Sequence, residues 1–168
     1  MAELAAEFTE LFRAEHREVR DRLLDLVEAF RRRDGEQASA LAAEVVRLTG
    51  PHFRYEEEAL YPALVDLFGP EYVEKLLADH DQAIEHARHI GRLAETEVLT
   101  DAEVVEATTR VRAILPHVSD CDGLSIMVEV VPEENVRAVL RARTRARADD
   151  LDLLTWASTL RERSAVAA

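Results

Sequence analysis

Apolar residues recur every three or four positions along almost the whole chain of 168 residues, and this spacing most constrains its fold. Such a stripe is typical of an amphipathic α-helix with one buried face. The first stripe, over about residues 3–33, includes Phe8, Phe12, Val19 and Leu23. Only five Gly and five Pro are available to interrupt the pattern. The sequence therefore predicts long helices.

Further helices are expected over about 36–68, 71–96, 100–131 and 132–148, followed by a short segment that contains Trp156. The turn signals between the long helices are Asp34-Gly35, Gly69-Pro70 and the capping box from Thr100 to Glu103. Four long helices joined by short turns favour an all-α fold. We expect an up-down antiparallel four-helix bundle with extra C-terminal helical segments packed outside it.

Residues 1–148 are expected to form the bundle domain, and residues 149–168 a short C-terminal helical extension. Inside the second helix, Gly50-Pro51 predicts a kink or a short break just before His52. Pro116 and Gly123 predict that the fourth helix is bent or loosened locally.

The charge balance excludes several classes of partner. Lys and Arg number 21 against 34 for Asp and Glu, which gives a net charge of −13. Nucleic acids and anionic membranes both favour a basic surface, so neither is expected as a partner. No apolar run approaches the roughly 18 residues of a membrane span. The acidic N-terminal stretch lacks the layout of a signal peptide, and we expect a cytoplasmic protein.

A single cysteine, Cys121, excludes an internal disulfide and a zinc site built from cysteines. The basic stretch at residues 141–147 is interpreted as a solvated helix face that balances charge, with binding of an acidic partner as the alternative.

Each of the four long helices carries one histidine on its apolar face, namely His16, His52, His80 and His117. The second helix adds Glu56 one turn after His52, and residues four apart on a helix lie about 5–6 Å from each other. His86 and His89 lie on other faces of the third helix and are expected at the surface.

A histidine in a core is commonly a structural residue satisfied by one hydrogen bond, but four on four helices are hard to explain in that way. Burying several imidazoles and a carboxylate without partners costs on the order of several kcal/mol, which a metal ion offsets. Imidazole with carboxylate suits iron, manganese or zinc. The pattern therefore predicts a buried metal site.

The segment from His52 to Pro62, HFRYEEEALYP, resembles the H-F-x-x-E-E-x-x-L-Y-P signature of the hemerythrin-like (HHE cation-binding) family. The other inward histidines follow in the order typical of that family, and the resemblance covers about residues 4–146. It implies an up-down four-helix bundle around two non-heme iron ions. The resemblance further implies iron ligands at His16, His52, His80 and His117, and a bridging carboxylate at Glu56.

The chain departs from the family pattern in the fourth helix. Family members usually carry a carboxylate four or five residues after the histidine, where this chain has Cys121 and Asp122. Asp122 is the preferred second bridging ligand, provided that the helix is distorted between Pro116 and Gly123. Cys121 is the alternative ligand, although a small buried apolar side chain is its commoner role. The run after this motif, from Gly123 to Glu129, is also altered.

In the third helix, the second histidine of many family members is absent. Leu76 and Ile84 stand one turn to either side of His80. One iron is therefore expected to have fewer protein ligands, and hence an open position.

Several polar residues beside the signature remain open to two interpretations. Glu57 and Glu58 are expected at the surface or behind the metal ligands. Tyr55 and Tyr61 either pack in the core or donate hydrogen bonds to a bound oxygen species.

The resemblance implies a di-iron protein that binds or reacts with O₂, NO or peroxide at an open iron position. The alternatives are a di-iron oxidase, a catalase-like enzyme that decomposes peroxide, an iron or oxygen sensor, a metal store and a purely structural bundle. Whether the chain is an enzyme stays open at this point. A redox partner or a second copy of the chain are the protein partners considered.

Overall fold

The structure, a computed structural model, describes residues 2–162, without the side chains of residues 2, 126 and 127. Over that range the chain is helical and has no strand. The elements in chain order are α1 (Ala2–Arg32), α2 (Gly35–Tyr55), the π-helical turn η1 (Glu56–Leu60), α3 (Tyr61–Phe68), α4 (Pro70–Ala94), α5 (Asp101–Leu124), the 3₁₀ turn η2 (Ser125–Val130), α6 (Glu133–Asp149) and α7 (Leu153–Thr159).

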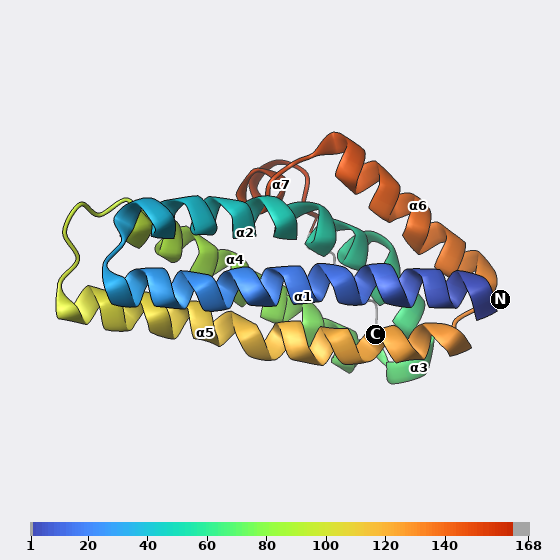
Figure 1. Cartoon of the computed structure of the whole chain (residues 1–168). Helices are drawn as coiled ribbons and strands as arrows, with labels where there is room; N and C mark the ends of the chain where they lie inside the picture. Colours follow the sequence, from blue (N-terminus) through green and yellow to red (C-terminus); the bar gives the residue numbers. More distant parts are fainter. Residues whose placement is uncertain (1, 163–168) are drawn as a thin grey trace.

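Helices α1, α2, α4 and α5 form an elongated bundle in which each helix packs on the next and α5 packs back on α1 (Figure 1). The predicted all-α bundle with additional C-terminal helices is therefore confirmed. Helix α6 leans across α2 and η1, and α7 packs against α2 and α4. The domain boundary expected at residue 148 lies in the last turn of α6 and stays a prediction, while residues 163–168 of the expected extension lie outside the described part of the chain.

Short polar motifs define where the bundle helices begin. Asp34 caps α2 by accepting a hydrogen bond from the Gln37 N–H. Gly69 adopts φ 81°, a conformation that side chains rarely tolerate, and so allows the sharp turn before Pro70 opens α4.

The predicted capping box begins α5. The Thr100 hydroxyl accepts from the Glu103 N–H, and the Glu103 carboxylate accepts from the Thr100 N–H. We expect Thr100→Ala to lower the free energy of unfolding by about 1 kcal/mol, measured by urea denaturation. Thr144→Ala, at an exposed position within α6, serves as the control and should cause no loss. Equal stabilities for the Thr100 variant and the unaltered chain would contradict this role.

The break expected just before His52 does not occur, because α2 is helical from Gly35 through Pro51 to Tyr55. Gly50 has a different role there. A Cβ atom at this position would lie 2.2 Å from the Leu151 carbonyl oxygen and 2.6 Å from the Leu153 nitrogen. The glycine therefore lets the turn before α7 approach α2 closely.

The irregularity in this part of the chain comes later, at η1, where the Tyr61 N–H donates to the Glu56 carbonyl five residues back. In α5 the helix continues past Pro116 and Gly123 to Leu124. The loosening expected between those two residues is instead the 3₁₀ turn η2, which follows them.

Two apolar clusters fill the bundle, one on either side of its middle. The first contains Leu23, Phe30, Ile84, Val111 and Trp156. The second contains Phe8, Phe12, Leu64, Leu76 and Leu124. All of these side chains are buried. The four inward histidines belong to neither cluster and lie where the two meet along the helices.

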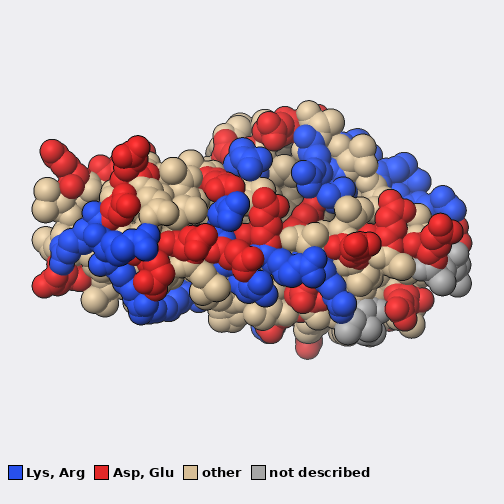
Figure 2. All heavy atoms as spheres, in the orientation of Figure 1, with Lys and Arg blue, Asp and Glu red and all other residues tan. Residues whose placement is uncertain are grey.

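Acidic and basic side chains are interspersed over the face shown in Figure 2. Within the basic stretch at residues 141–147, Arg143 and Arg147 pair with Glu15, and Arg145 pairs with Glu58. These contacts favour charge balance as the role of that stretch. Among residues 2–162, no helix combines the length and apolar character needed to cross a membrane.

Candidate metal centre

The four histidines predicted to face inward are buried together at the middle of the bundle. Each is at most 7% exposed, and they come from α1, α2, α4 and α5. The ring centroids of His16 and His52 lie 4.5 Å apart, and those of His80 and His117 lie 4.8 Å apart. The regular spacing of apolar residues on each helix turns these rings toward the interior of the bundle.

Glu56 lies between the two histidine pairs and is fully buried. Its Oε1 atom is 3.3 Å from His52 Nε2, and its Oε2 atom is 3.2 Å from His80 Nε2. Among the described residues, neither oxygen has a partner with hydrogen-bond geometry. Burial alone raises the pKa of Glu56, but the adjacent imidazoles hold it well below its usual range. The site therefore contains a buried, ionised carboxylate with free lone pairs, which suits a cation.

The outer nitrogens of three histidines are held by acceptors outside the cluster. These contacts are His16 Nδ1 to the Phe12 carbonyl at 2.9 Å, His52 Nδ1 to Glu15 Oε2 at 2.9 Å, and His80 Nδ1 to Glu57 Oε1 at 2.8 Å. A carbonyl or an ionised carboxylate only accepts, so each Nδ1 carries the proton. In the neutral imidazole, the inward Nε2 atom then has the free lone pair that binds a metal, the arrangement found in protein metal sites.

The histidines differ in how readily they become charged. Burial lowers the pKa of His16 to about 4 and that of His117 to about 3. Burial also disfavours charge on His52, but Glu56 and Glu15 outweigh it and raise the pKa of His52 to about 10. His16 and His117 are therefore neutral at pH 7, the form in which imidazole binds a metal.

Within residues 2–162, two groups of three buried residues have ligand atoms within 4.8 Å of one another. One group is His16, Glu56 and Cys121, and the other is Glu56, His80 and His117. Glu56 belongs to both. His52 is in neither group, but its Nε2 atom faces Glu56 Oε1 at 3.3 Å.

The two candidates for the last ligand, Cys121 and Asp122, have different surroundings in the structure. The Sγ atom of Cys121 is fully buried and lies 3.6 Å from His117 Nε2, because residues four apart share a helix face. Asp122 is in neither metal group of the described residues, since α5 stays α-helical to Leu124 and the distortion needed to turn Asp122 inward is absent. Its Oδ1 atom is nevertheless buried, without a hydrogen-bond partner in the described part of the chain.

Two tyrosines beside the centre have different orientations. The Tyr55 hydroxyl donates to Glu15 at 2.8 Å and lies 3.0 Å from the outer nitrogen, Nδ1, of His52. The Tyr61 hydroxyl points inward, 3.0 Å from His80 Nε2 and 3.5 Å from Cys121 Sγ.

Sequence reasoning missed Glu15, which precedes an inward histidine and so falls off the apolar stripe. No periodicity distinguishes it from the other charged residues of α1. Glu57, by contrast, lies behind a candidate ligand, one of the two places expected for it. His86 and His89 are partly exposed and outside both metal groups.

Aromatic rings close the centre on its apolar side. The Phe53 ring stacks on His80 with centroids 3.7 Å apart, and Phe12 lies 4.3 Å from His16. Beside them is a cavity of about 10 Å³, lined by His16, Val19, Thr49, His52, Phe53, His117 and Val118. That volume is close to the smallest that holds one water molecule.

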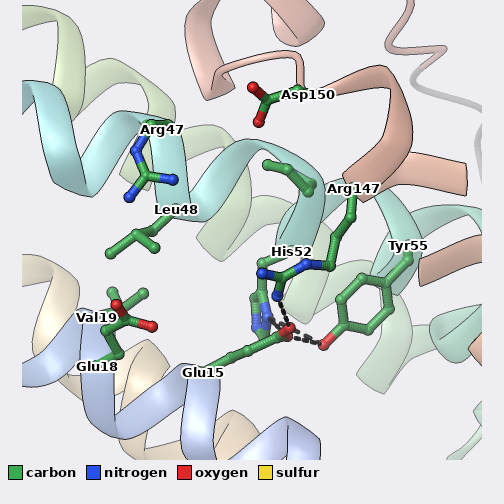
Figure 3. A pocket seen from close by; sticks show the side chains of 10 residues that line it. Glu15, Glu18, Val19, Arg47, Leu48, His52, Tyr55, Arg147 and Asp150 are labelled. Atoms are coloured by element: carbon green, nitrogen blue, oxygen red, sulfur yellow. Dashed lines mark hydrogen bonds and ion pairs between the residues drawn. The ribbon is translucent and has the colours of Figure 1, made fainter. Parts of the chain in front are cut away.

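On the polar side, a pocket of about 90 Å³ opens next to His52 (Figure 3). Glu15 projects into it and meets His52, Tyr55 and Arg147, while Arg47 and Asp150 line its opposite wall.

A family model described as the hemerythrin HHE cation binding domain matches residues 7–121. The match includes every candidate ligand except Asp122, and it ends before η2, α6 and α7. No curated protein and no solved structure matches the chain.

Proposed function

The chain belongs to the hemerythrin HHE cation-binding family, and from that premise we propose that it is a non-heme di-iron protein. Its function would be to bind O₂, NO or peroxide, or to react with them, at a centre held by His16, His52, His80, His117 and Glu56. Cys121 or Asp122 would complete the ligand set.

The observation that carries this proposal is the position of Glu56. Its two oxygens face imidazoles from different helices, and the residue is shared by both groups of potential ligands. A carboxylate placed in this way can bridge two ions. Imidazole and carboxylate donors, with at most one thiol, suit iron.

Bound iron would supply exchange between ferrous and ferric states and a coordination position for a small ligand. The protein orients the ligands through the Nδ1 contacts of His16, His52 and His80. Phe12 and Phe53 exclude bulk water from the histidine rings. The cavity of about 10 Å³ beside them favours a ligand of very few atoms.

Tyr61 would hold a proton at the centre. Burial raises the pKa of its hydroxyl well above the ordinary value, so the group stays protonated near neutral pH. A hydroxyl aimed at the inner nitrogen of His80 is placed to donate a hydrogen bond to a ligand bound there.

The test is iron content together with the visible spectrum, on the full chain loaded with ferrous iron without air. We expect about two iron ions per chain, and a change of spectrum on exposure to O₂, NO or H₂O₂. His117→Ala should lower the iron content. His89→Ala removes a histidine from the exterior of α4 and should leave it unchanged. The proposal would be overturned if the unaltered chain held one iron ion or none and its visible spectrum did not change with O₂, NO or H₂O₂.

One observation favours an enzyme over a carrier. Helix α4 contributes a single histidine to the metal groups of the described residues, and its neighbours one turn away, Leu76 and Ile84, are buried apolar side chains. Fewer protein ligands leave more exchangeable positions on an ion. Continued consumption of H₂O₂ by the iron-loaded chain would identify a peroxide-decomposing enzyme, whereas a single stoichiometric reaction would identify a binding protein.

A further inference from the structure

Two carboxylates hold the outer nitrogens of candidate ligands, and both are themselves held by arginines from the C-terminal helices. Glu15 contacts His52 and Glu57 contacts His80. The arginines come from α6 and from the residues just after α7, in a part of the chain that follows the family match at residues 7–121.

Arg161 binds Glu57 in a bidentate contact. Its Nε atom donates to both carboxylate oxygens at 3.1 and 2.9 Å, and one Nη atom donates at 2.8 Å. The two side chains are only 10% and 7% exposed. Asp81 and the Trp156 ring hold the guanidinium from its other sides. Such a paired contact fixes orientation as well as charge.

Arg143 and Arg147 bind Glu15 on the opposite side of the centre. Arg143 Nη2 lies 2.6 Å from Glu15 Oε1, and Arg147 Nη1 lies 2.9 Å from the same oxygen. The second oxygen of Glu15 is then left for His52 and Tyr55 (Figure 3). Glu15 therefore uses one oxygen for the arginines and the other for His52, whereas the Oε1 atom of Glu57 binds both Arg161 and His80.

We propose that Arg143, Arg147 and Arg161 are positioning residues of the metal centre, acting through Glu15 and Glu57 on the electron-donating strength of His52 and His80. The C-terminal helices would thus set the reduction potential of the bound iron. This inference rests on the proposed di-iron function.

The charges around each histidine fix the direction in which each substitution shifts the reduction potential. Arg161 partly neutralises the negative charge of Glu57, so the carboxylate accepts a weaker hydrogen bond from the Nδ1–H group of His80. Without the arginine, this hydrogen bond is stronger and the imidazole donates more electron density to the bound iron, which favours the ferric state. We therefore expect Arg161→Gln to lower the reduction potential. Glu57→Gln removes the anionic acceptor and should raise it.

The experiment is a redox titration of the iron-loaded full chain, followed through its visible spectrum. Arg161→Gln and Arg143→Gln should both shift the potential downward, and Glu57→Gln should shift it upward while weakening iron binding by about 10- to 100-fold. Arg161→Lys keeps the positive charge but cannot make the bidentate contact, so its reduction potential should lie between those of Arg161→Gln and the unaltered chain. Arg145→Gln is the matched control, because this α6 residue is exposed and contacts Glu58.

A purely structural role of the arginines does not predict that Arg161→Gln and Glu57→Gln shift the reduction potential in opposite directions. Equal potentials in Arg161→Gln, Arg145→Gln and the unaltered chain would overturn this inference while the di-iron function stands. Absence of iron from the unaltered chain would overturn both. If Arg161→Gln does not fold, Arg143→Gln and Arg161→Lys carry the same test on opposite sides of the centre.

Discussion

Glu56→Gln is expected to abolish iron binding while the helical content stays unchanged. The carboxamide has nearly the same shape, but it removes the buried negative charge and replaces one acceptor oxygen with a donor. That donor would face an imidazole nitrogen only 3.2 to 3.3 Å away. Since both metal groups share Glu56, both ions should be lost together. We expect iron content below about a tenth of that of the unaltered chain, consistent with a loss of ten- to a hundredfold or more in affinity.

The matched control is Glu58→Gln, two residues along the same turn. Glu58 is exposed and pairs with Arg54 at the surface, so iron content should not change. Metal analysis and circular dichroism on both variants check the result. Full iron loading in Glu56→Gln would show that the two groups do not depend on a shared carboxylate.

Gly50→Ala is expected to have the largest effect on stability of any change to a small residue in α2. The added methyl group would meet backbone atoms of residues 151–153 at 2.2 to 2.6 Å, and backbone cannot move aside as a flexible side chain can. We expect a loss of about 3 kcal/mol or more, or displacement of α7 from the bundle. Trp156, the single tryptophan and nearly fully buried, reports directly on that displacement through its fluorescence.

Gly91→Ala is the control for this change, because no described atom lies within 4 Å of a Cβ placed there. Alanine favours helix over glycine, so this variant should gain about 0.5 to 1 kcal/mol. Denaturant unfolding of both variants gives the comparison. A Gly50→Ala chain as stable as the unaltered protein, with unshifted Trp156 emission, would contradict the close contact.

Periodicity was sufficient to predict the bundle and the burial of the four histidines, because each of these features depends on a single helix face. His16, for example, continues the stripe of Phe12 and Val19, and it is buried as they are. The ligand assignments themselves stay predictions, as does the choice between Cys121 and Asp122.

The spacing of apolar residues could not predict features that depend on contacts between distant segments of the chain. The Gly50-Pro51 pair predicts a kink or a short break, whereas Gly50 admits the turn before α7, roughly a hundred residues further along the chain. Glu15 is indistinguishable in sequence from a solvated glutamate, and only the approach of α6 and α2 shows its contacts.

The π-helical turn η1 has a consequence for the comparison of relatives. Its hydrogen bond from the Tyr61 N–H to the Glu56 carbonyl encloses one residue more than an α-helical turn does, so Glu56 and Tyr61 share a face although they are five positions apart. In an uninterrupted α-helix, positions four apart share a face in the same way. A relative one residue shorter between these two positions could therefore keep both side chains at the centre. An alignment gap here would mark a difference in helical winding and not a lost site.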